Sequence, residues 1–494
     1  MTDDNEVAGG RAGSAGPLAG PYGLFVDGRW VEPDGGWFDD DCPSTGETVA
    51  RVPDASVDQV ARAVGAARRA FDDGGWSGAD PAFRASCLEQ LGRALAGARD
   101  DLVSLARVEW GCTANEDRLQ VDAPAHLAAG SARLATLPAE EEVAGVMGPM
   151  LVRHEPVGVV SAITPWNFPH TMNVMKLGPA LAAGNTVVLK PSPLSPLAGL
   201  ALARMVDEAT DIPPGVVNVV TTSDLGASRA LVDDPRVDMV TFTGSTAVGR
   251  DIMAAAGGTL KRLLLELGGK SATVLLDGVD LEEVLPTVLF EGCTLHAGQA
   301  CILKSRLVVR RQVHDEVVDR LATLAASVVV GDPLDPAVDM GPLITATQHG
   351  RVSALVAAAV ADGARLAAGG RRPPGLGRGH FYEPTVLADV APGSAIAQTE
   401  VFGPVLCVLA YDDEDEAVRI ANDSPYGLSG AVYGPDPDRA VDVARRIRTG
   451  QVAVNGTVPA EGPFGGFKQS GLGREVGVAG LREYTETKAI GLPR

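Results

Sequence analysis

The chain alternates between short apolar runs and longer amphipathic segments. From Val157 onward, runs of about five residues rich in branched side chains each end in turn residues. They read VGVVSAI, NTVVLK, VVNVV, VDMVTFT and SATVLL. Segments between them, such as LSPLAGLALARMVDEA, carry apolar residues at helical spacing. Strands that alternate with helices predict an α/β fold with a parallel sheet covered on both faces.

The flanking regions predict further elements. LFVDGRWVE (24–32) predicts two short strands around an Asp-Gly turn, and Ser56 is a good N-cap for a following helix. Alanine- and leucine-rich helical patterns run from Pro81 to about Ala135. After Cys301, the runs SRLVVR and VHDEVVDRLATLAASVVV predict a strand and a helix, and hence a second α/β domain.

One stretch, Glu140–Val160, breaks this texture. Its residues alternate in a hairpin-like pattern on either side of Met147-Gly148-Pro149, which predicts a hairpin between domains. A hairpin in that position is interpreted as a subunit contact.

Length and charge narrow the class of protein. A chain of 494 residues is too long for one core and predicts two or three domains. The formal net charge of -21 argues against binding nucleic acid or an anionic membrane surface. No window approaches the roughly 18 apolar residues of a membrane span. Residues 1–21 are acidic and rich in Gly, Ala, Ser and Pro, which predicts a disordered leader and no secretory signal.

The cysteines are scattered and form no CxxC pair and no Cys/His cluster. Neither a zinc site nor a disulfide framework is indicated, so no metal is expected. The pattern predicts a protein of the reducing cytoplasm. The six cysteines are Cys42, Cys87, Cys112, Cys293, Cys301 and Cys407.

Candidate chemistry lies in the turns that follow the strands, because parallel sheets bind ligands at the carboxyl ends of their strands. Glu266 in LLLELGGK is flanked by leucines, and desolvation there would raise its pKa and make it a base near neutral pH. A surface glutamate at a strand end is the equally weighted alternative. Asn167 in TPWNFP is either an oxyanion donor or an ordinary turn asparagine.

Four other segments are ambiguous by themselves. Lys190 in VVLKPS could meet a ribose or phosphate, or be solvated. GSTAVG places a Gly-Ser turn at a helix start, which suits phosphate but equally a plain turn, and it matches neither GxGxxG nor GxxxxGK[ST]. Glu400 in QTEVFGPV has no assignment from position alone. Cys301 in HAGQACILKSR is either a nucleophile or a buried, inert thiol.

Taken together, these segments resemble the aldehyde dehydrogenase superfamily. The resemblance runs from Leu24 to Ile490 and includes TPWNFP, ALAAGNTVVLKPSP, FTGSTAVG, LELGGKSA, AGQACILKSR, TEVFGPVL and PFGGFKQSGLGRE in the family's order. It implies oxidation of an aldehyde to the carboxylic acid with hydride transfer to NAD(P). It also implies a Rossmann variant without GxGxxG for the cofactor, which accounts for the missing fingerprint.

The resemblance also implies roles for individual residues. Cys301 is expected to attack the aldehyde carbon and form a thiohemiacetal, then a thioester. Asn167 and the Cys301 backbone N–H are expected to hold the oxyanion, and Glu266 to activate the hydrolytic water. Lys176 matches a lysine below the oxyanion site. The expected cofactor contacts are Ile163, Thr164, Trp166, Lys190, Ser192, Gly244, Ser245, Gly249, Leu267, Glu400 and Phe402.

The family comparison also implies domains and an assembly. The dinucleotide-binding domain is expected over residues 22–135 and 153–265, and the catalytic domain over 266–470. Residues 136–152 and 471–494 match the family's oligomerisation element, so a homodimer or homotetramer is implied.

Departures from the family pattern bear on cofactor and substrate. Pro193 stands where a glutamate often binds the adenosine ribose, so NADP stays open although NAD is favoured. His296 replaces a common asparagine and is expected to have a packing role. Met175 replaces a common tryptophan and softens the tunnel.

The expected substrate is an uncharged aliphatic or aromatic aldehyde. An aromatic content of 4% argues against a cage for a quaternary ammonium group. A CoA-acylating dehydrogenase is the first alternative, although such relatives usually lack a base like Glu266. A non-catalytic member of the fold is the second. The expected tunnel residues are Phe168, Met172, Met175, Ile302, Val458 and Phe464.

Overall fold

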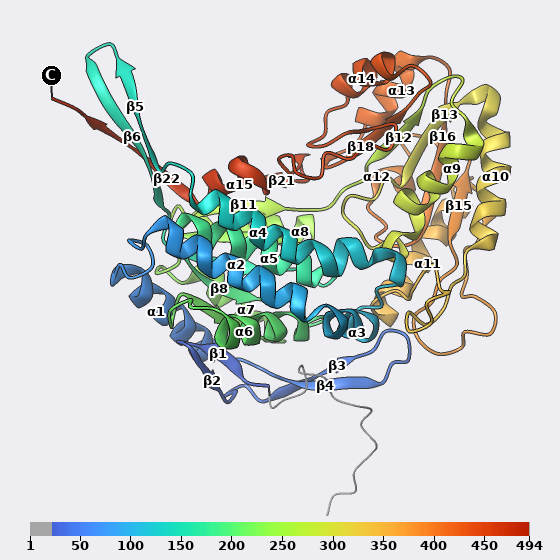
Figure 1. The fold of residues 1–494 in the computed structure, drawn as a ribbon. Helices are drawn as coiled ribbons and strands as arrows, with labels where there is room; N and C mark the ends of the chain where they lie inside the picture. The colour runs from blue at the N-terminus through green and yellow to red at the C-terminus, as the bar shows by residue number, and fades with distance from the viewer. Residues whose placement is uncertain (1–21, 494) are drawn as a thin grey trace, which may run out of the picture.

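The computed structural model describes residues 22–493, so the predicted disordered leader, residues 1–21, lies outside the described residues. Two large sheets occupy the two halves of the molecule, and a small three-stranded sheet projects from the first half (Figure 1). An α/β fold with two sheet-based halves agrees with the sequence prediction.

The first sheet has eight strands in the order β2-β1-β9-β8-β7-β10-β11-β21. Its central strands are parallel: β9 (Val217–Val219), β8 (Thr186–Lys190), β7 (Val159–Ile163), β10 (Met239–Thr243) and β11 (Arg262–Glu266). The strands at both edges run antiparallel: the predicted pair β1 (Leu24–Val26) and β2 (Arg29–Val31) at one edge, and β21 (Gly471–Leu472), which was not predicted, at the other.

The β1–β2 edge follows from its turn. Asp27 and Gly28 have φ values of 56° and 69°, the left-handed geometry of a tight hairpin turn. A two-residue turn can connect only antiparallel strands, whereas the central strands need helical crossovers.

Helices cover both faces of the first sheet. In β8, Val187 and Leu189 belong to one core cluster and Val188 to the other, so the strand is apolar throughout. Helices α5 and α6 pack on one face with α2 and α4 behind them, and α1, α7 and α8 pack on the other. Their bounds are α1 Val57–Asp72, α2 Pro81–Gly97, α4 Ala123–Ala135, α5 Pro169–Ala183, α6 Leu197–Ala209, α7 Leu225–Asp233 and α8 Thr246–Ala256.

Ser56 is the N-cap of α1, as predicted, and forms a capping box with Gln59. The helical region 81–135 is broken after α2 and α3 (Arg99–Glu109) by the 3-10 turn η1 (Ala114–Glu116) and the π-helical turn η2 (Arg118–Asp122). Gly111, with φ of 78°, lies against Pro342 at this break. Because the helices end here, η1 contacts the second half of the molecule, where Asn115 donates to the Asp339 carbonyl.

The second sheet has seven strands in the order β14-β15-β16-β13-β12-β18-β19, and only the β14–β15 pair is antiparallel. The strands are β12 Ala272–Leu275, β13 Arg306–Arg310, β14 Arg365–Ala368, β15 Thr385–Ala388, β16 Val405–Tyr411, β18 Gly430–Tyr433 and β19 Ala453–Val454. This sheet is the predicted second α/β unit.

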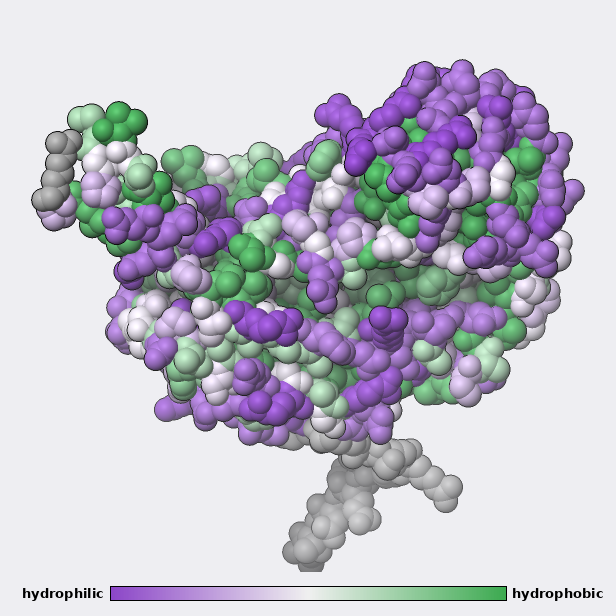
Figure 2. Space-filling view, turned by 45° about the horizontal axis from the view of Figure 1, so that its top comes forward, coloured by the Kyte–Doolittle hydropathy of each residue, from purple (hydrophilic) through white to green (hydrophobic). Residues whose placement is uncertain are grey.

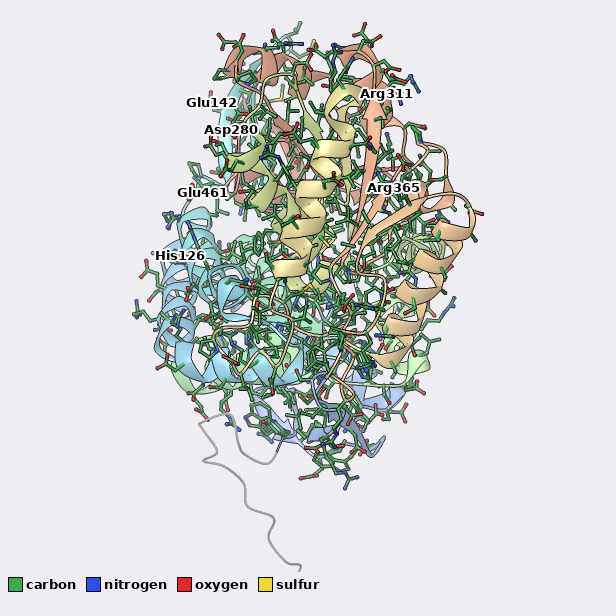
Figure 3. The ribbon with its side chains drawn as sticks, turned by 90° about the vertical axis from the view of Figure 1, so that its right-hand side faces the viewer. His126, Glu142, Asp280, Arg311, Arg365 and Glu461 are labelled. Carbon is green, nitrogen blue, oxygen red and sulfur yellow. The ribbon has the colours of Figure 1, made fainter. Side chains whose placement is uncertain are left out.

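Two helical layers cover the second sheet. Helices α9 and α10 pack on one face, and α11, α13 and α14 on the other. Charged side chains such as Asp280, Arg311 and Arg365 lie at the periphery of this half (Figure 3). The bounds are α9 Leu281–Leu289, α10 His314–Ser327, α11 Ala346–Ala361, α12 Ala395–Gln398, α13 Glu414–Asn422 and α14 Pro437–Arg446.

Helix α10 is shorter than its sequence pattern predicts. It ends at Ser327 instead of continuing through Val328–Val330, and Val330 instead forms a parallel bridge with Met340. β-branched residues fit extended backbone better than a helix end, which explains the difference.

The small sheet has the order β22-β6-β5, with β5 (Glu140–Gly145), β6 (Gly148–Pro156) and β22 (Thr485–Gly491). The β5–β6 hairpin is the one predicted over 140–160. Its tip carries the exposed Val146 and Met147, and Figure 2 shows hydrophobic side chains there.

The small sheet differs from the predicted 136–152 and 471–494 at two points. Strand β6 continues past 152 to Pro156. Strand β21 belongs to the first large sheet, and α15 (Gly477–Glu483) packs on α4 and α5.

The remaining short elements are β3 Trp37–Asp41, β4 Thr48–Pro53, β17 Tyr426–Gly427, β20 Phe467–Lys468, η3 Phe290–Thr294, η4 Leu295–Gly298 and η5 Arg311–Val313. Within residues 22–493, no helix combines the length and apolar character needed to cross a membrane.

Candidate active site

The carboxyl edge of the first sheet brings four predicted segments together. Lys190 ends β8 opposite Ile163 of β7, and Thr243 of β10 lies opposite Glu266 of β11. The surface is hollowed between the two halves of the molecule (Figure 2). Side chains at this edge can therefore meet loops of the second half.

Asn167 links the first sheet to the loop that carries Cys301. It lies in the turn between β7 and α5, and its Nδ2 donates a hydrogen bond to the Gln299 carbonyl at 2.8 Å. Thr164, earlier in the same turn, donates from its Oγ1 to Asn173 Oδ1 at 2.7 Å. The turn is thus anchored on both sides of Asn167.

The loop before Cys301 has an unusual backbone. His296, Ala297 and Gly298 have φ values of 48°, 50° and 74°. Two of these are not glycine, and left-handed backbone at such residues costs on the order of 1–3 kcal/mol each. At Gly298 a Cβ would lie 2.0 Å from the Gly403 carbonyl oxygen, so this position requires glycine.

Gln299 holds this loop together. Its N–H and Nε2 donate to the His296 carbonyl at 2.9 and 3.1 Å, and its Oε1 accepts the Ile344 N–H at 2.9 Å. Because its carbonyl also accepts the Asn167 amide, Gln299 forms hydrogen bonds with both its backbone and its side chain. The loop geometry is therefore fixed by hydrogen bonds as well as by packing.

Cys301 is half-buried at the end of this loop. Desolvation, with smaller contributions from the nearby carboxylates of Glu266 and Glu400, raises the pKa of its thiol to about 12. The three side chains are thus close enough to interact electrostatically. In this site without bound nucleotide, the thiol is held in its neutral form.

Glu266 is 2% exposed, and neither of its oxygens accepts a hydrogen bond from any residue of the described chain. Burial raises its pKa well above the ordinary value, and the charge of Glu475 adds to the rise. A buried carboxylate without donors is costly to keep charged, so it readily takes a proton.

Lys176 is buried beside the carboxyl groups of Glu266 and Glu475. Its Nζ lies 2.7 Å from Glu475 Oε1 and donates to Thr241 Oγ1 at 3.1 Å, and both Lys176 and Glu475 are fully buried. The Lys176 charge lowers the pKa of Glu266, opposing the effect of burial. The predicted lysine of the site therefore pairs with Glu475 and also lowers the pKa of Glu266 by its charge.

The predicted nucleotide contacts of the first half lie at two places on the first sheet. Ser245 caps α8 by accepting the Val248 N–H, and a Cβ at Gly249 would lie 2.5 Å from Leu267 Cδ2. Only glycine therefore lets α8 pack against Leu267, and the helix N-terminus stays close to the strand ends. Gly244 precedes this cap.

Lys190 is 5% exposed, and its Nζ donates to the Pro191 carbonyl at 3.0 Å. Burial lowers the pKa of Lys190 to about 8, while Asp54 opposes this shift. Ser192 follows and accepts the Leu194 N–H with its Oγ at 3.2 Å. A buried ammonium with one carbonyl partner keeps donor capacity for a ligand.

Glu400 and Phe402 lie against the Cys301 loop from the second half. Gly269 N–H donates to Glu400 Oε1 at 2.9 Å, and the Phe402 ring meets Trp166 edge-on at 5.4 Å. Burial raises the pKa of Glu400. One small cavity is lined by Gly269, Ala300, Leu303, Glu400 and Phe402, among others.

Some of the predicted tunnel residues share one apolar cluster. Phe168, Met172 and Ile302 pack with Leu295, Ala300, Leu303 and Phe290. Met175 and Phe464 are half-buried and are not members of this cluster, and Val458 is 48% exposed. The structure therefore groups three of the six predicted residues around the Cys301 loop.

Three residues of the site carried no prediction. Glu116 accepts the His296 N–H at 2.7 Å, Gln299 holds the loop, and Glu475 pairs with Lys176. Gln299 is part of the AGQAC segment and could have been singled out. Glu116 stands between Asn115 and Asp117, so nothing local indicates that it is buried. Glu475 ends the segment PFGGFKQSGLGRE, but its partner Lys176 lies 299 positions away, so no local pattern indicates the buried pair.

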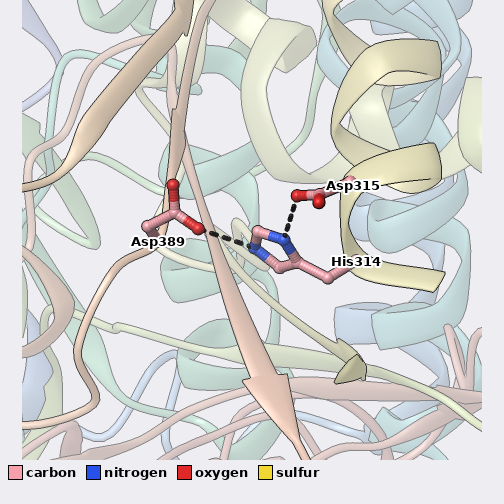
Figure 4. Close-up of side chains that lie close together, drawn as sticks. All are labelled: His314, Asp315 and Asp389. Carbon is pink, nitrogen blue, oxygen red and sulfur yellow. Dashed lines mark hydrogen bonds and ion pairs between the residues drawn. The ribbon is translucent and has the colours of Figure 1, made fainter. Parts of the chain in front are cut away.

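A separate cluster joins His314, Asp315 and Asp389 on the second half (Figure 4). His314 Nδ1 lies 3.0 Å from Asp315 Oδ1, and its Nε2 lies 3.8 Å from Asp389 Oδ1. Arg365 pairs with both carboxylates, at 3.4 and 2.8 Å. Because this guanidinium already offsets their charge, we assign no metal to the cluster.

A profile of the aldehyde dehydrogenase family matches residues 30–490. The chain belongs to this family and is an enzyme of that class. It is 41% identical to a 3-succinoylsemialdehyde-pyridine dehydrogenase from a Pseudomonas species, over 94% of this chain and 98% of that protein.

Solved structures give the same picture. An aldehyde dehydrogenase C variant from Pseudomonas syringae, crystallised with NAD+ and octanal, is 40% identical, with a TM-score of 0.91 over 95% of this chain and 96% of that chain. Betaine aldehyde dehydrogenase from Staphylococcus aureus, in complex with NAD+, is 34% identical, with a TM-score of 0.93 over 95% and 94% of the two chains. The fold is therefore that of aldehyde dehydrogenases.

Proposed function

We propose that this enzyme oxidises an uncharged aliphatic or aromatic aldehyde to the carboxylic acid, with NAD as hydride acceptor. The observation that carries the proposal is the convergence of three groups on one loop. The Cys301 thiol, the Asn167 amide on the Gln299 carbonyl, and the unpartnered Glu266 carboxyl lie together at the sheet edge. This set supplies a nucleophile, an oxyanion donor and a base.

The chain's own groups account for the chemistry as follows. Cys301 loses its proton to solvent, and its sulfur attacks the aldehyde carbon. The second N–H of Asn167 Nδ2 and the Cys301 backbone N–H donate to the resulting oxyanion. When bound, the nicotinamide accepts the hydride, which leaves a thioester on Cys301. Glu266 then takes a proton from water, and the hydroxide attacks the thioester carbon. The C–S bond breaks, the acid leaves, and the proton held by Glu266 passes to the sulfur and restores the thiol.

Glu266 also favours hydrolysis over transfer to CoA. Its carboxyl has no hydrogen-bond donor in the described chain and its pKa is raised, which suits a base that must accept a proton near neutral pH. A dehydrogenase that passes its acyl group to CoA needs no such base. Retention of this group together with Cys301 likewise argues against a non-catalytic member of the fold.

The residues present suit a dinucleotide. The α8 N-terminus with Ser245 and Gly249 suits the pyrophosphate, and the buried Lys190 ammonium suits a ribose. Glu400 and Phe402 border the cavity beside the Cys301 loop and would hold the nicotinamide end. The other predicted contacts, Ile163, Thr164, Trp166, Ser192, Gly244 and Leu267, come from the same strand ends and turns. NAD is favoured because similar aldehyde dehydrogenases were crystallised with NAD+.

The apolar cluster around Phe168 and Ile302 supports an uncharged substrate. A relative of similar fold was crystallised with octanal. The betaine aldehyde dehydrogenase among the similar structures makes a cationic aldehyde the natural comparison substrate.

The assembly, domains and compartment belong to the same proposal. The two large sheets would form the cofactor and catalytic domains. The projecting β5–β6–β22 sheet, with Val146 and Met147 exposed at its tip, would join subunits into a homodimer or homotetramer. All six cysteines are free, which suits the reducing cytoplasm.

The test is an absorbance assay for the reduced nicotinamide with NAD or NADP and a panel of aldehydes. Octanal, benzaldehyde, succinic semialdehyde and betaine aldehyde would be compared for the wild type and Cys301→Ala. The proposal expects NAD-dependent turnover of the uncharged aldehydes, lost by at least about 10⁴-fold in the variant. A clear preference for a charged aldehyde, or acyl-CoA formation that requires CoA, would overturn it.

A further inference from the structure

Glu116 contacts the Cys301 loop from the other half of the molecule. It belongs to η1 of the first half, 180 positions before His296 in sequence. Its Oε1 accepts the His296 backbone N–H at 2.7 Å, and its Oε2 lies 3.5 Å from His296 Nδ1. Glu116 is fully buried and His296 is 1% exposed.

The Glu116 carboxyl is itself held by a buried chain of donors. Gln120 Nε2 donates to Glu116 Oε2 at 2.9 Å, and Trp110 Nε1 donates to Gln120 Oε1 at 2.6 Å. All three side chains are fully buried. The position of the carboxylate is therefore set by the first half, before it meets the loop.

The bond from Glu116 reaches the strained part of the loop. His296 is the first of the three residues with positive φ, and its carbonyl accepts both donors of Gln299. The Gln299 carbonyl in turn accepts the Asn167 amide. One continuous path of hydrogen bonds thus joins Trp110 to Asn167 and passes through the backbone that precedes Cys301.

The His296 ring supports the same path by packing. Its centroid lies 6.2 Å from that of Trp166 and 5.6 Å from that of Phe168, the two residues that flank Asn167. Its Nε2 has no hydrogen-bond partner in the described chain. The contact of Glu116 with the backbone N–H therefore supplies the directional anchor for this residue.

We infer that Glu116 is a positioning residue, which holds the Cys301 loop in its left-handed conformation and so aligns the thiol with the Asn167 amide. The inference rests on the proposed function for its kinetic readout. It assigns a purpose to a buried carboxylate that is not among the residues proposed to bind the aldehyde or the nucleotide. Without this acceptor, the loop would relax toward ordinary backbone angles.

The test compares Glu116→Ala, Glu116→Gln and the double variant Glu116→Gln/Gln120→Glu. In Glu116→Gln an amide NH₂ faces the Gln120 NH₂, so two donors oppose each other. The double variant restores a donor–acceptor pair and leaves an acceptor for Trp110 Nε1. Asn115→Ala is the matched control, since Asn115 Nδ2 also crosses to the second half, to the Asp339 carbonyl at 2.9 Å, without touching the loop.

Hydrogen exchange of the peptide spanning 295–303 and steady-state kinetics are both measured on the full-length enzyme. If Glu116 positions the loop, hydrogen exchange in this peptide should be faster in both single variants. In both, kcat should also be about 10- to 100-fold lower, with KM and nucleotide affinity within about twofold. The double variant should recover most of both effects, and Asn115→Ala should show neither.

Two results would overturn the inference. One is unchanged exchange of the 295–303 peptide in Glu116→Ala. The other is a kcat loss that matches only the fraction of unfolded enzyme, with no rescue in the double variant. If the wild type turns over no aldehyde, the proposed function fails, while the exchange measurement still tests the anchoring of the loop.

Discussion

Two buried glutamates near the Cys301 loop are surrounded in opposite ways. Glu116 has an N–H donor on one oxygen and an amide donor on the other. Glu266 has no donor on either oxygen in the described chain, and burial with the charge of Glu475 raises its pKa well above normal. The first arrangement stabilises a fixed carboxylate, and the second keeps a carboxyl ready to exchange a proton.

The contrast separates two uses of a buried acid. A satisfied carboxylate can fix the backbone of its neighbours, because its bonds specify direction. An unsatisfied one destabilises the folded state, and such a cost is typical of a site that performs chemistry. Substitutions at the two residues should therefore differ in kind as well as in size.

Among the variants that test this contrast, Glu266→Gln should have the largest effect on turnover. We expect steady-state turnover to fall about 10²- to 10⁴-fold, because the amide cannot take the proton of the attacking water. The first burst of reduced nicotinamide should remain near one per active site. Rapid mixing with aldehyde measures both, and Glu116→Gln should instead slow the burst. Loss of the burst in Glu266→Gln would mean that Glu266 is needed at or before hydride transfer. The two glutamates would then no longer differ in the step that they affect.

Asn167→Ala should have the next largest effect. Removing the amide that lies on the Gln299 carbonyl takes away an oxyanion donor, so we expect the burst rate to fall about 10²- to 10³-fold. The same rapid-mixing experiment measures this rate, with Asn115→Ala as the control. An unaffected burst rate would mean that Asn167 has a structural role only, and that the hydrogen-bond path from Glu116 does not reach a catalytic group.

A smaller effect concerns the thiol itself. With the pKa of Cys301 raised to about 12, alkylation by iodoacetamide should accelerate about tenfold per pH unit from 7 to 10 in the enzyme without nucleotide. Glu266→Gln should speed alkylation, because the Glu266 charge raises that pKa. Peptide mass spectrometry follows Cys301 separately from the other cysteines. A plateau below pH 9 would show that the thiolate is already stabilised.

The smallest effect is on stability, where the two glutamates should differ in sign. The pKa of Glu266 is raised in the folded state, so the folded enzyme binds more protons than the unfolded chain above about pH 4.3. Its contribution to stability is therefore present in acid and is lost as the pH rises. Gln at this position removes that loss, so the Tm gain of Glu266→Gln should grow from pH 5 to pH 8.

Glu116→Gln should lower Tm instead, because two buried donors then face each other at a cost of about 1–3 kcal/mol. Scanning calorimetry at one fixed scan rate should show shifts of a few degrees in opposite directions. A lower Tm for both variants would mean that the Glu266 carboxyl is stabilised by contacts equivalent to those of Glu116.

Much of this architecture could be predicted from local patterns. Continuous apolar runs predicted the central strands, because strands buried on both faces carry apolar residues at every position. The Asp27-Gly28 turn and the Ser56 cap were confirmed, since both depend on residues close in sequence. The antiparallel β21 edge was not predicted, because its partner β11 is distant in sequence. The end of α10 at Ser327 was not predicted either, because the bridge from Val330 to Met340 forms only in the folded chain.

The sequence by itself determined the family, the Cys301, Glu266 and Asn167 candidates, and the turns that present them, because each of these is a local signal of residue type and spacing. Only the tertiary structure decided the surroundings of the acids. Which segments fold against each other decides that Glu116 and Glu475 are buried. It also decides that the Glu266 oxygens have no hydrogen-bond donor in the described chain. Hydrogen-bond satisfaction is a property of three-dimensional neighbours, and these neighbours lie up to 299 positions apart in the chain.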